Sequence, residues 1–219
     1  MKHRFLLTLM LLGLPSLLYS QTDTTGAAQE NDATPGTWMI VASAGWTFPA
    51  EPREFKDQFK INYNFGGGIA YSMSPGDVGY GEVSLLLHYY NTLFSRSGFR
   101  TANNLPTGTG VYGYPGDVYT GMLQFRGVYG TSKESIAPYF TMAIGVLHLA
   151  LPQRGLTTPP TVLYKEYTTT TFGWAAGLGV DVPVTDWYTL FVDGKFLLGV
   201  TGTSGHRLFS AGGGIRIRI

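Results

Sequence analysis

The chain has 219 residues, enough for one domain or two small ones, and 30 of them are glycine, about twice the usual share. Aromatic residues make up 14% and charged residues only 13%, so the composition is too apolar and aromatic for a disordered chain. A formal net charge of +1 gives no reason to expect a nucleic-acid partner. The absence of cysteine excludes disulfides, thiolate metal sites and a cysteine nucleophile.

The first segment predicts a secretory signal peptide. Within residues 1–20, Lys2 and Arg4 precede a short apolar run, and Ser20 offers a small residue for cleavage. A retained membrane anchor is the alternative, but the apolar run is too short to span a bilayer. Residues 21–36 have a polar composition without periodicity, which is typical of a flexible periplasmic linker.

Residues 37–219 predict a single domain made of strands, because no segment carries a convincing helical period. Eight segments are rich in β-branched and aromatic residues and are bounded by turn residues: 38–48, 61–73, 79–93, 117–129, 138–149, 167–183, 187–200 and 207–219. Short connections (74–77, 131–137, 185–186) alternate with longer ones (49–60, 95–116, 150–166), and the last one (201–206) is short. This layout is typical of transmembrane β-barrels.

Residue alternation favours a barrel over a soluble sandwich. In segment 167–183, large apolar side chains alternate with glycine, alanine and threonine. A sandwich would carry many charges on its small polar face, whereas this face suits a narrow interior. All seven charged residues well inside strands fall on that face: Glu82, Arg126, Asp181, Asp193, Lys195, Arg216 and Arg218. We therefore predict an all-β fold, a single eight-stranded antiparallel transmembrane β-barrel with up-and-down topology.

The seven inward charges predict an ionic cluster in the lumen. Their places along the strands concentrate them near the short turns. Unpaired ions are costly in so confined a space, so we expect the arginines of the last strand to meet acids of other strands. The arginines are Arg216 and Arg218, and the candidate partners are Asp193, Glu82 and Asp181. Such a network would close this end of the barrel; the alternative is that these groups only fill space and contact water.

Aromatic residues gather near the strand ends, and amphipathic rings favour the two membrane interfaces. Those toward the short turns are Trp38, Tyr71, Tyr80, Tyr129, Trp187 and Tyr188. Those toward the long loops are Trp46, Phe48, Tyr63, Phe65, Tyr89, Tyr119 and Phe172. We interpret the two groups as girdles; ordinary strand propensity of aromatic residues is the alternative.

Two stretches resemble the small outer-membrane β-barrel proteins, the eight-stranded OmpA/OmpX-like and opacity-protein-like group. They are residues 137–146 and the run Phe172–Lys195 with its tight turn. The resemblance implies a barrel embedded in outer-membrane lipid and inserted by the barrel-insertion machinery. Gly214, Ile217 and Ile219 look like the C-terminal signal that this machinery reads, with isoleucine in place of the usual final aromatic residue.

Enzymatic motifs are poor in this sequence. Lipid deacylases built on small barrels are similar to one another in carrying a His-x-Ser pair. None of the three histidines His88, His148 and His206 begins such a pair. A Ser–His–acid triad assembled in space stays open, since such triads are recognised by geometry. The histidines and scattered acids have no metal-ligand spacing, and the glycine runs precede no helix that could bind phosphate. We therefore predict no catalytic residues, no metal site and no cofactor.

The connection 95–116 is the candidate recognition loop. Long barrel loops commonly carry recognition, and arginines with exposed aromatic rings often make interface hot spots. The residues of this kind are Arg96, Phe99, Arg100, Tyr112 and Tyr114. An extracellular ligand or protein would bind there; a disordered or rim-extending loop is the alternative.

These patterns predict a non-enzymatic protein of the Gram-negative outer membrane, with both termini in the periplasm. Its role would be structural or one of surface interaction, because eight strands leave an interior just wide enough for side chains. The alternative function is a narrow channel or carrier for small or apolar solutes. A lipid-modifying outer-membrane enzyme is the third hypothesis.

Overall fold

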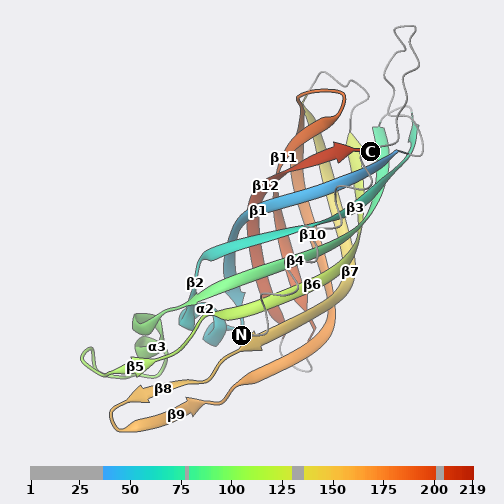
Figure 1. Ribbon diagram of the computed structural model, residues 1–219. Helices are drawn as coiled ribbons and strands as arrows, with labels where there is room; N and C mark the ends of the chain where they lie inside the picture. Colours follow the sequence, from blue (N-terminus) through green and yellow to red (C-terminus); the bar gives the residue numbers. More distant parts are fainter. Residues whose placement is uncertain (1–36, 77–78, 130–135, 201–204) are drawn as a thin grey trace, which may run out of the picture. The chain divides into compact units, whose positions relative to one another are not determined.

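The computed structural model describes residues 37–76, 79–129, 136–200 and 205–219, which form a closed antiparallel barrel of eight long strands (Figure 1). The barrel strands are β1 (Trp38–Glu51), β3 (Asn62–Gly76), β4 (Gly79–Phe94), β6 (Gly116–Tyr129), β7 (Ala137–Leu151), β10 (Tyr167–Pro183), β11 (Tyr188–Gly199) and β12 (His206–Arg218). The predicted architecture is confirmed, with each strand within three residues of its expected bounds. The predicted signal peptide and linker lie outside the described residues.

Closure comes from the pairing of the first and last strands. Met39 of β1 pairs with Arg218 of β12, and the ladder continues to Glu51 and Arg207. Each barrel strand pairs with two other barrel strands. Strands β4 and β6 pair directly, although shorter elements lie between them in the sequence. A closed ladder leaves no barrel strand with an open edge, as a bilayer-spanning sheet requires.

Short elements occupy the three long connections and gather at one end of the barrel, here called the loop end (Figure 1). They are α2 (Arg53–Gln58), β2 (Phe59–Lys60), α3 (Arg96–Ala102), β5 (Val111–Tyr112), β8 (Arg154–Thr157) and β9 (Pro160–Tyr164). Strands β5, β8 and β9 form a separate three-stranded sheet. The opposite end, where residues 184–187 join β10 to β11, is called the turn end. Neither described helix is long and apolar enough to cross a membrane.

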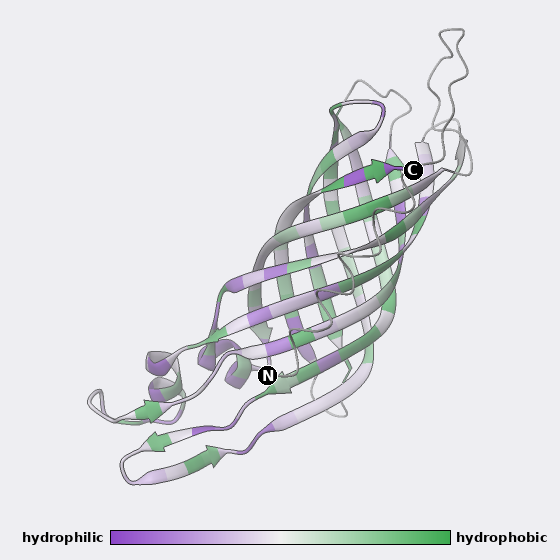
Figure 2. Cartoon of the chain, in the orientation of Figure 1, coloured by the Kyte–Doolittle hydropathy of each residue, from purple (hydrophilic) through white to green (hydrophobic). Residues whose placement is uncertain are grey.

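Hydrophobic and more polar residues alternate along the strands (Figure 2), and large apolar side chains are exposed on the outer wall, as the alternation predicts. In β10, Phe172 and Leu178 are more than half exposed, while Gly173 and Asp181 on the opposite face of the strand point inward and are buried. The seven charged residues named above share the inward face, which spares the lipid-facing surface a cost of roughly 2–4 kcal/mol per charge near its middle.

The aromatic residues near the strand ends follow the prediction with one correction. Trp38, Trp187 and Tyr129 toward the turn end are exposed, as are Trp46 and Tyr63 toward the loop end. Tyr80, by contrast, lies on the inward face of β4 and packs inside the barrel. It shares its face with Glu82, so strand alternation takes its ring away from the membrane interface.

Two apolar clusters lie on the inward side of the wall. The loop-half cluster contains Phe55, Phe59, Tyr90, Val118, Met122, Ala143, Leu147, Leu149, Leu151, Leu197 and Leu208. The turn-half cluster contains Val41, Ala70, Leu86, Val128, Tyr139 and Phe191. Phe55 of α2 and Phe59 of β2 therefore reach the interior from the loop end, and the charged residues lie among the members of the second cluster.

Candidate functional site: the barrel interior

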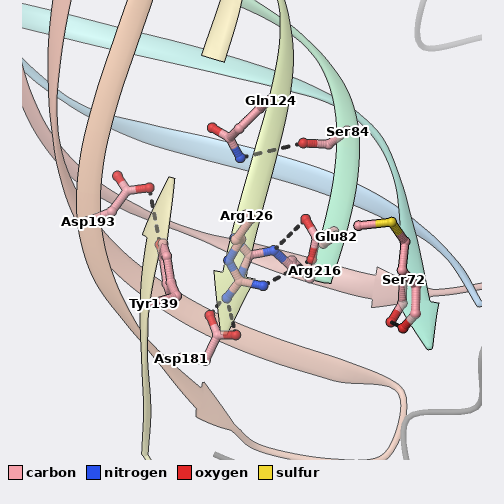
Figure 3. Close-up of polar contacts among 10 residues, drawn as sticks. Ser72, Glu82, Ser84, Gln124, Arg126, Tyr139, Asp181, Asp193 and Arg216 are labelled. Carbon is pink, nitrogen blue, oxygen red and sulfur yellow. Dashed lines mark hydrogen bonds and ion pairs between the residues drawn. The ribbon is translucent and has the colours of Figure 1, made fainter. Parts of the chain in front are cut away.

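Four buried charges meet across the turn half of the lumen (Figure 3). In this ionic cluster, Arg126 donates from Nη1 to Glu82 Oε2 at 3.0 Å and from Nη2 to Asp181. Arg216 donates from Nη1 to Asp181 Oδ1 at 2.6 Å, and its Nε lies 3.7 Å from Glu82 Oε1. All four side chains are at most 5% exposed. Two cations and two anions thus form a neutral group, which is what burial of charge demands.

The four residues reach one another because the wall curves around them. Glu82 of β4 and Arg126 of β6 are direct cross-strand partners. Asp181 projects from β10, which β7 separates from β6. Arg216 projects from β12, which β11 separates from β10. Inward-facing side chains fill the interior of an eight-stranded barrel, so charges from these four strands can meet there.

Aromatic rings hold the two guanidinium groups in place. The Tyr139 ring lies 3.9 Å from Arg126 Cζ and 5.3 Å from Arg216 Cζ, and the Phe191 ring lies 4.3 Å from Arg216 Cζ. Gly214 makes room for Phe191, because a Cβ there would collide with that ring. The Nε atoms of both arginines are buried without a hydrogen-bond acceptor. The cluster is held by charge pairing and stacking more than by a complete set of hydrogen bonds.

A second, smaller ion pair lies next to the cluster. Lys195 Nζ is 3.0 Å from Asp193 Oδ2, and the Tyr139 hydroxyl donates to the same carboxylate oxygen at 3.1 Å. Tyr139 therefore touches both groups. Of the seven predicted lumen charges, the structure brings six into these two groups; Arg218 is half-buried and belongs to neither.

Sequence reasoning missed a contact between Ser43 and His88. The Ser43 hydroxyl lies 3.1 Å from His88 Nε2, beside a cavity about the size of one water molecule that Tyr90, Asp193 and Lys195 also line. The His88 ring occupies space left by Gly66, where a Cβ would overlap it. A serine beside a histidine is the start of a nucleophilic site, and within the described residues no carboxylate is hydrogen-bonded or ion-paired to His88. Only the folded barrel reveals this pair, since 45 residues separate the two side chains.

The predicted recognition loop is folded, which corrects part of that hypothesis. Phe99 is 0% exposed and packs against Phe94 and Tyr164, so it belongs to the core of the loop and not to its surface. Arg100 donates from Nε to the Thr109 carbonyl at 2.7 Å. The exposed members are Arg96 and Tyr114, with Tyr112 half-buried. Phe99 is buried because it lies on the inner face of the short helix α3. In the sequence, only the spacing of Ser95 and Phe99 indicates this helix.

The residues of the predicted assembly signal lie at the turn end. Gly214 faces inward beside Phe191, while Ile217 and Ile219 are exposed on the outward face. No group of three or more potential metal-ligating side chains exists within residues 37–76, 79–129, 136–200 and 205–219.

Comparisons with known proteins address the fold. No family model and no curated protein sequence matches the chain. The crystal structure of Neisserial surface protein A superposes with a TM-score of 0.54 at 12% identity, over 83% of this chain and 97% of that one. The N-terminal barrel domain of Pseudomonas aeruginosa OprF gives a TM-score of 0.46 at 14% identity over 83% and 99%; the outer-membrane protein AlkL, solved in lipid bilayers, gives 0.46 at 12% over 90% and 97%. The first likeness, with the apolar wall and the closed ladder, gives this chain the fold of the small eight-stranded outer-membrane β-barrel proteins.

Proposed function

We propose that the chain is a non-enzymatic protein of the Gram-negative outer membrane whose role is structural or one of surface interaction. One observation supports this proposal: buried side chains line both halves of the interior, the ionic cluster in the turn half and apolar side chains in the loop half. An interior lined in this way favours a barrel that serves to display its loops, and it argues against a general pore.

Conductance tests the occupied interior. The purified full chain in a planar lipid bilayer should give no discrete conductance steps above the lipid baseline. A larger porin reconstituted in the same membrane serves as the positive control. Steady, discrete steps from the unmodified chain would refute the packed-interior proposal.

The proposed orientation places the turn end and both termini in the periplasm and the loop end outside the cell. Short turns on the periplasmic side and longer loops outside are the rule in such barrels. Gly214, Ile217 and Ile219 would then face the barrel-insertion machinery from the periplasm. A protease of broad specificity added to intact cells should cut around exposed Arg96 in α3 and spare residues 74–77. The reverse cleavage pattern would invert the topology.

A narrow carrier for apolar solutes is the second candidate, favoured by the leucine-rich lining of the loop half. Leu147, Leu149 and Leu208 are all at most 1% exposed, so a solute could enter only if α2 moved and withdrew Phe55. A cross-link between α2 and the barrel rim should abolish uptake of an apolar fluorophore into liposomes if this function is correct. It should leave a purely structural barrel unaffected.

A further inference from the structure

The loop end holds a buried cation without a counter-ion. Arg154 of β8 is 7% exposed, yet none of the ion pairs within the described residues includes it. Its Nε donates to Gln58 Oε1 at 2.5 Å, and Nη1 reaches the Pro152 carbonyl at 3.4 Å. Neither acceptor carries a charge, so the guanidinium charge stays uncompensated where water is largely excluded.

Aromatic rings fix the guanidinium in one place. Its Cζ lies 4.6 Å from the Tyr164 ring centroid and 5.4 Å from that of Phe59. Tyr164 is anchored in turn, because its hydroxyl donates to Asn103 at 3.0 Å and its ring packs edge-on against Phe99. A planar guanidinium held this way presents its remaining N–H groups in a fixed direction, which favours recognition of planar or tetrahedral oxyanions.

An orphan donor lies beside this cation. Gln58 is 0% exposed, its amide oxygen accepts from Arg154, and its amide nitrogen Nε2 has no hydrogen-bond partner. The amide cannot be turned around, because that would set its N–H groups against those of the guanidinium. A buried amide nitrogen left without an acceptor is unfavourable, and an acceptor placed there would also lie next to the positive charge.

From these contacts we infer that Arg154 and Gln58 form a binding site for a single oxyanion group, such as a phosphate or a carboxylate. The oxyanion would accept from the free edge of the guanidinium and from the Gln58 amide nitrogen, so one ligand would satisfy both groups. Burial lowers the pKa of Arg154 below its ordinary value, as expected for a charge that lacks a partner, and arginine still remains protonated at neutral pH. The site lies at the loop end, where residues of α2, β2, β8 and β9 meet.

Glu54 is the internal competitor for this site. It lies on the exposed side of α2, within electrostatic reach of Arg154 but without an ion pair to it. If Glu54 swung inward it would neutralise the arginine and leave no place for a ligand. The test must therefore separate an external oxyanion from this carboxylate.

The experiment titrates inorganic phosphate into the folded full chain in neutral detergent by calorimetry, with ionic strength held constant by chloride. We expect saturable one-to-one binding. Gln58→Glu places a carboxylate on the guanidinium, keeps the side-chain shape and should weaken phosphate binding at least tenfold. Arg154→Gln should abolish binding, and Arg53→Gln, an exposed arginine of α2 at the same end, is the matched control that should leave it unchanged.

Three outcomes overturn the inference. The first is no saturable binding to the unmodified chain. The second is binding that survives both Gln58→Glu and Arg154→Gln. The third is binding that appears only in Glu54→Gln, which would make Glu54 the resident partner. A folded barrel migrates differently on a denaturing gel before and after boiling. Gln58→Glu should keep this difference, so loss of phosphate binding in this variant would not result from unfolding.

The source of the oxyanion is decided by a second arm in phosphatidylcholine vesicles with or without phosphatidic acid. Weaker apparent binding of inorganic phosphate in the phosphatidic-acid vesicles would identify a lipid phosphate monoester as occupant. Equal binding in both would identify a soluble oxyanion. The inference adds a ligand class to the proposed surface role, and its failure would leave the conductance test of that role untouched.

Discussion

The two halves of the barrel interior obey the same alternation and contain opposite chemistry. Near the turn end, Glu82, Arg126, Asp181 and Arg216 form buried ion pairs; near the loop end, leucine and aromatic side chains make apolar contacts. Charge pairs demand particular partners and penalise a mismatch, whereas apolar contacts tolerate repacking. We infer that the turn half fixes the strand register and that the loop half supplies the less specific part of the stability.

The largest effect is expected from Arg126→Ala. This change leaves Glu82 and Asp181 buried with only Arg216 between them, and loss of one partner of a buried ion group typically costs roughly 3–5 kcal/mol. Urea unfolding in detergent micelles measures the free energy. Arg218→Ala, outside both ionic groups, is the matched control and should change it little. Equal effects of the two variants would contradict the special place given to the cluster.

Leu147→Ala probes the other half. Leu147 is 1% exposed within the loop-half cluster, so the cavity should lower the unfolding free energy by about 3 kcal/mol, a usual value for a buried leucine. Leu178→Ala on the outward face, where the side chain is 72% exposed, is the control. If both variants lose the same stability, the loop half contributes no packed interior.

Arg216→Ala should affect permeability more visibly than stability. Arg126 still hydrogen-bonds both acids, so the loss should be smaller than for Arg126→Ala, although one buried acid charge is left without a counter-ion. Removing this side chain also opens the turn half, which should add discrete conductance in a planar bilayer. Unchanged conductance together with unchanged thermal stability would show that the cluster closes nothing.

The smallest effect is expected from Tyr139→Phe. The ring would keep its stacking on Arg126, while the hydrogen bond to Asp193 would be lost. A single hydrogen bond contributes about 1 kcal/mol net, so the midpoint of urea unfolding should shift slightly without a change in slope. Tyr139→Leu, which also removes the stacking, should cost clearly more; if it does not, the ring has no role in positioning the guanidinium.

The wall of the barrel is predictable because alternation is local, whereas the interior contacts depend on closure. Phe172 and Asp181 could be placed outside and inside from the sequence alone. Which acid each arginine meets depends on the stagger of eight strands, which no single segment encodes. Leu147 and Leu149 were not anticipated as interior residues, since apolar side chains on both faces erase the alternation there. Phe99 and Arg154 depend on the folding of loops whose composition resembles ordinary connections.

The seam between β1 and β12 also bears on how fast the barrel can fold. Met39 pairs with Arg218, and Ser43 with Gly214, so these contacts join positions that are almost the whole domain apart in sequence. Contacts of such high sequence separation slow folding, because the chain must lose the conformational entropy of a very long loop before the hydrogen bonds of the ladder can form. No segment released early from the ribosome can complete the cylinder, and the unclosed sheet would expose two unpaired edges until the last strand arrives. Assembly of this chain must therefore follow its synthesis, and the waiting polypeptide has to be kept from pairing with its neighbours.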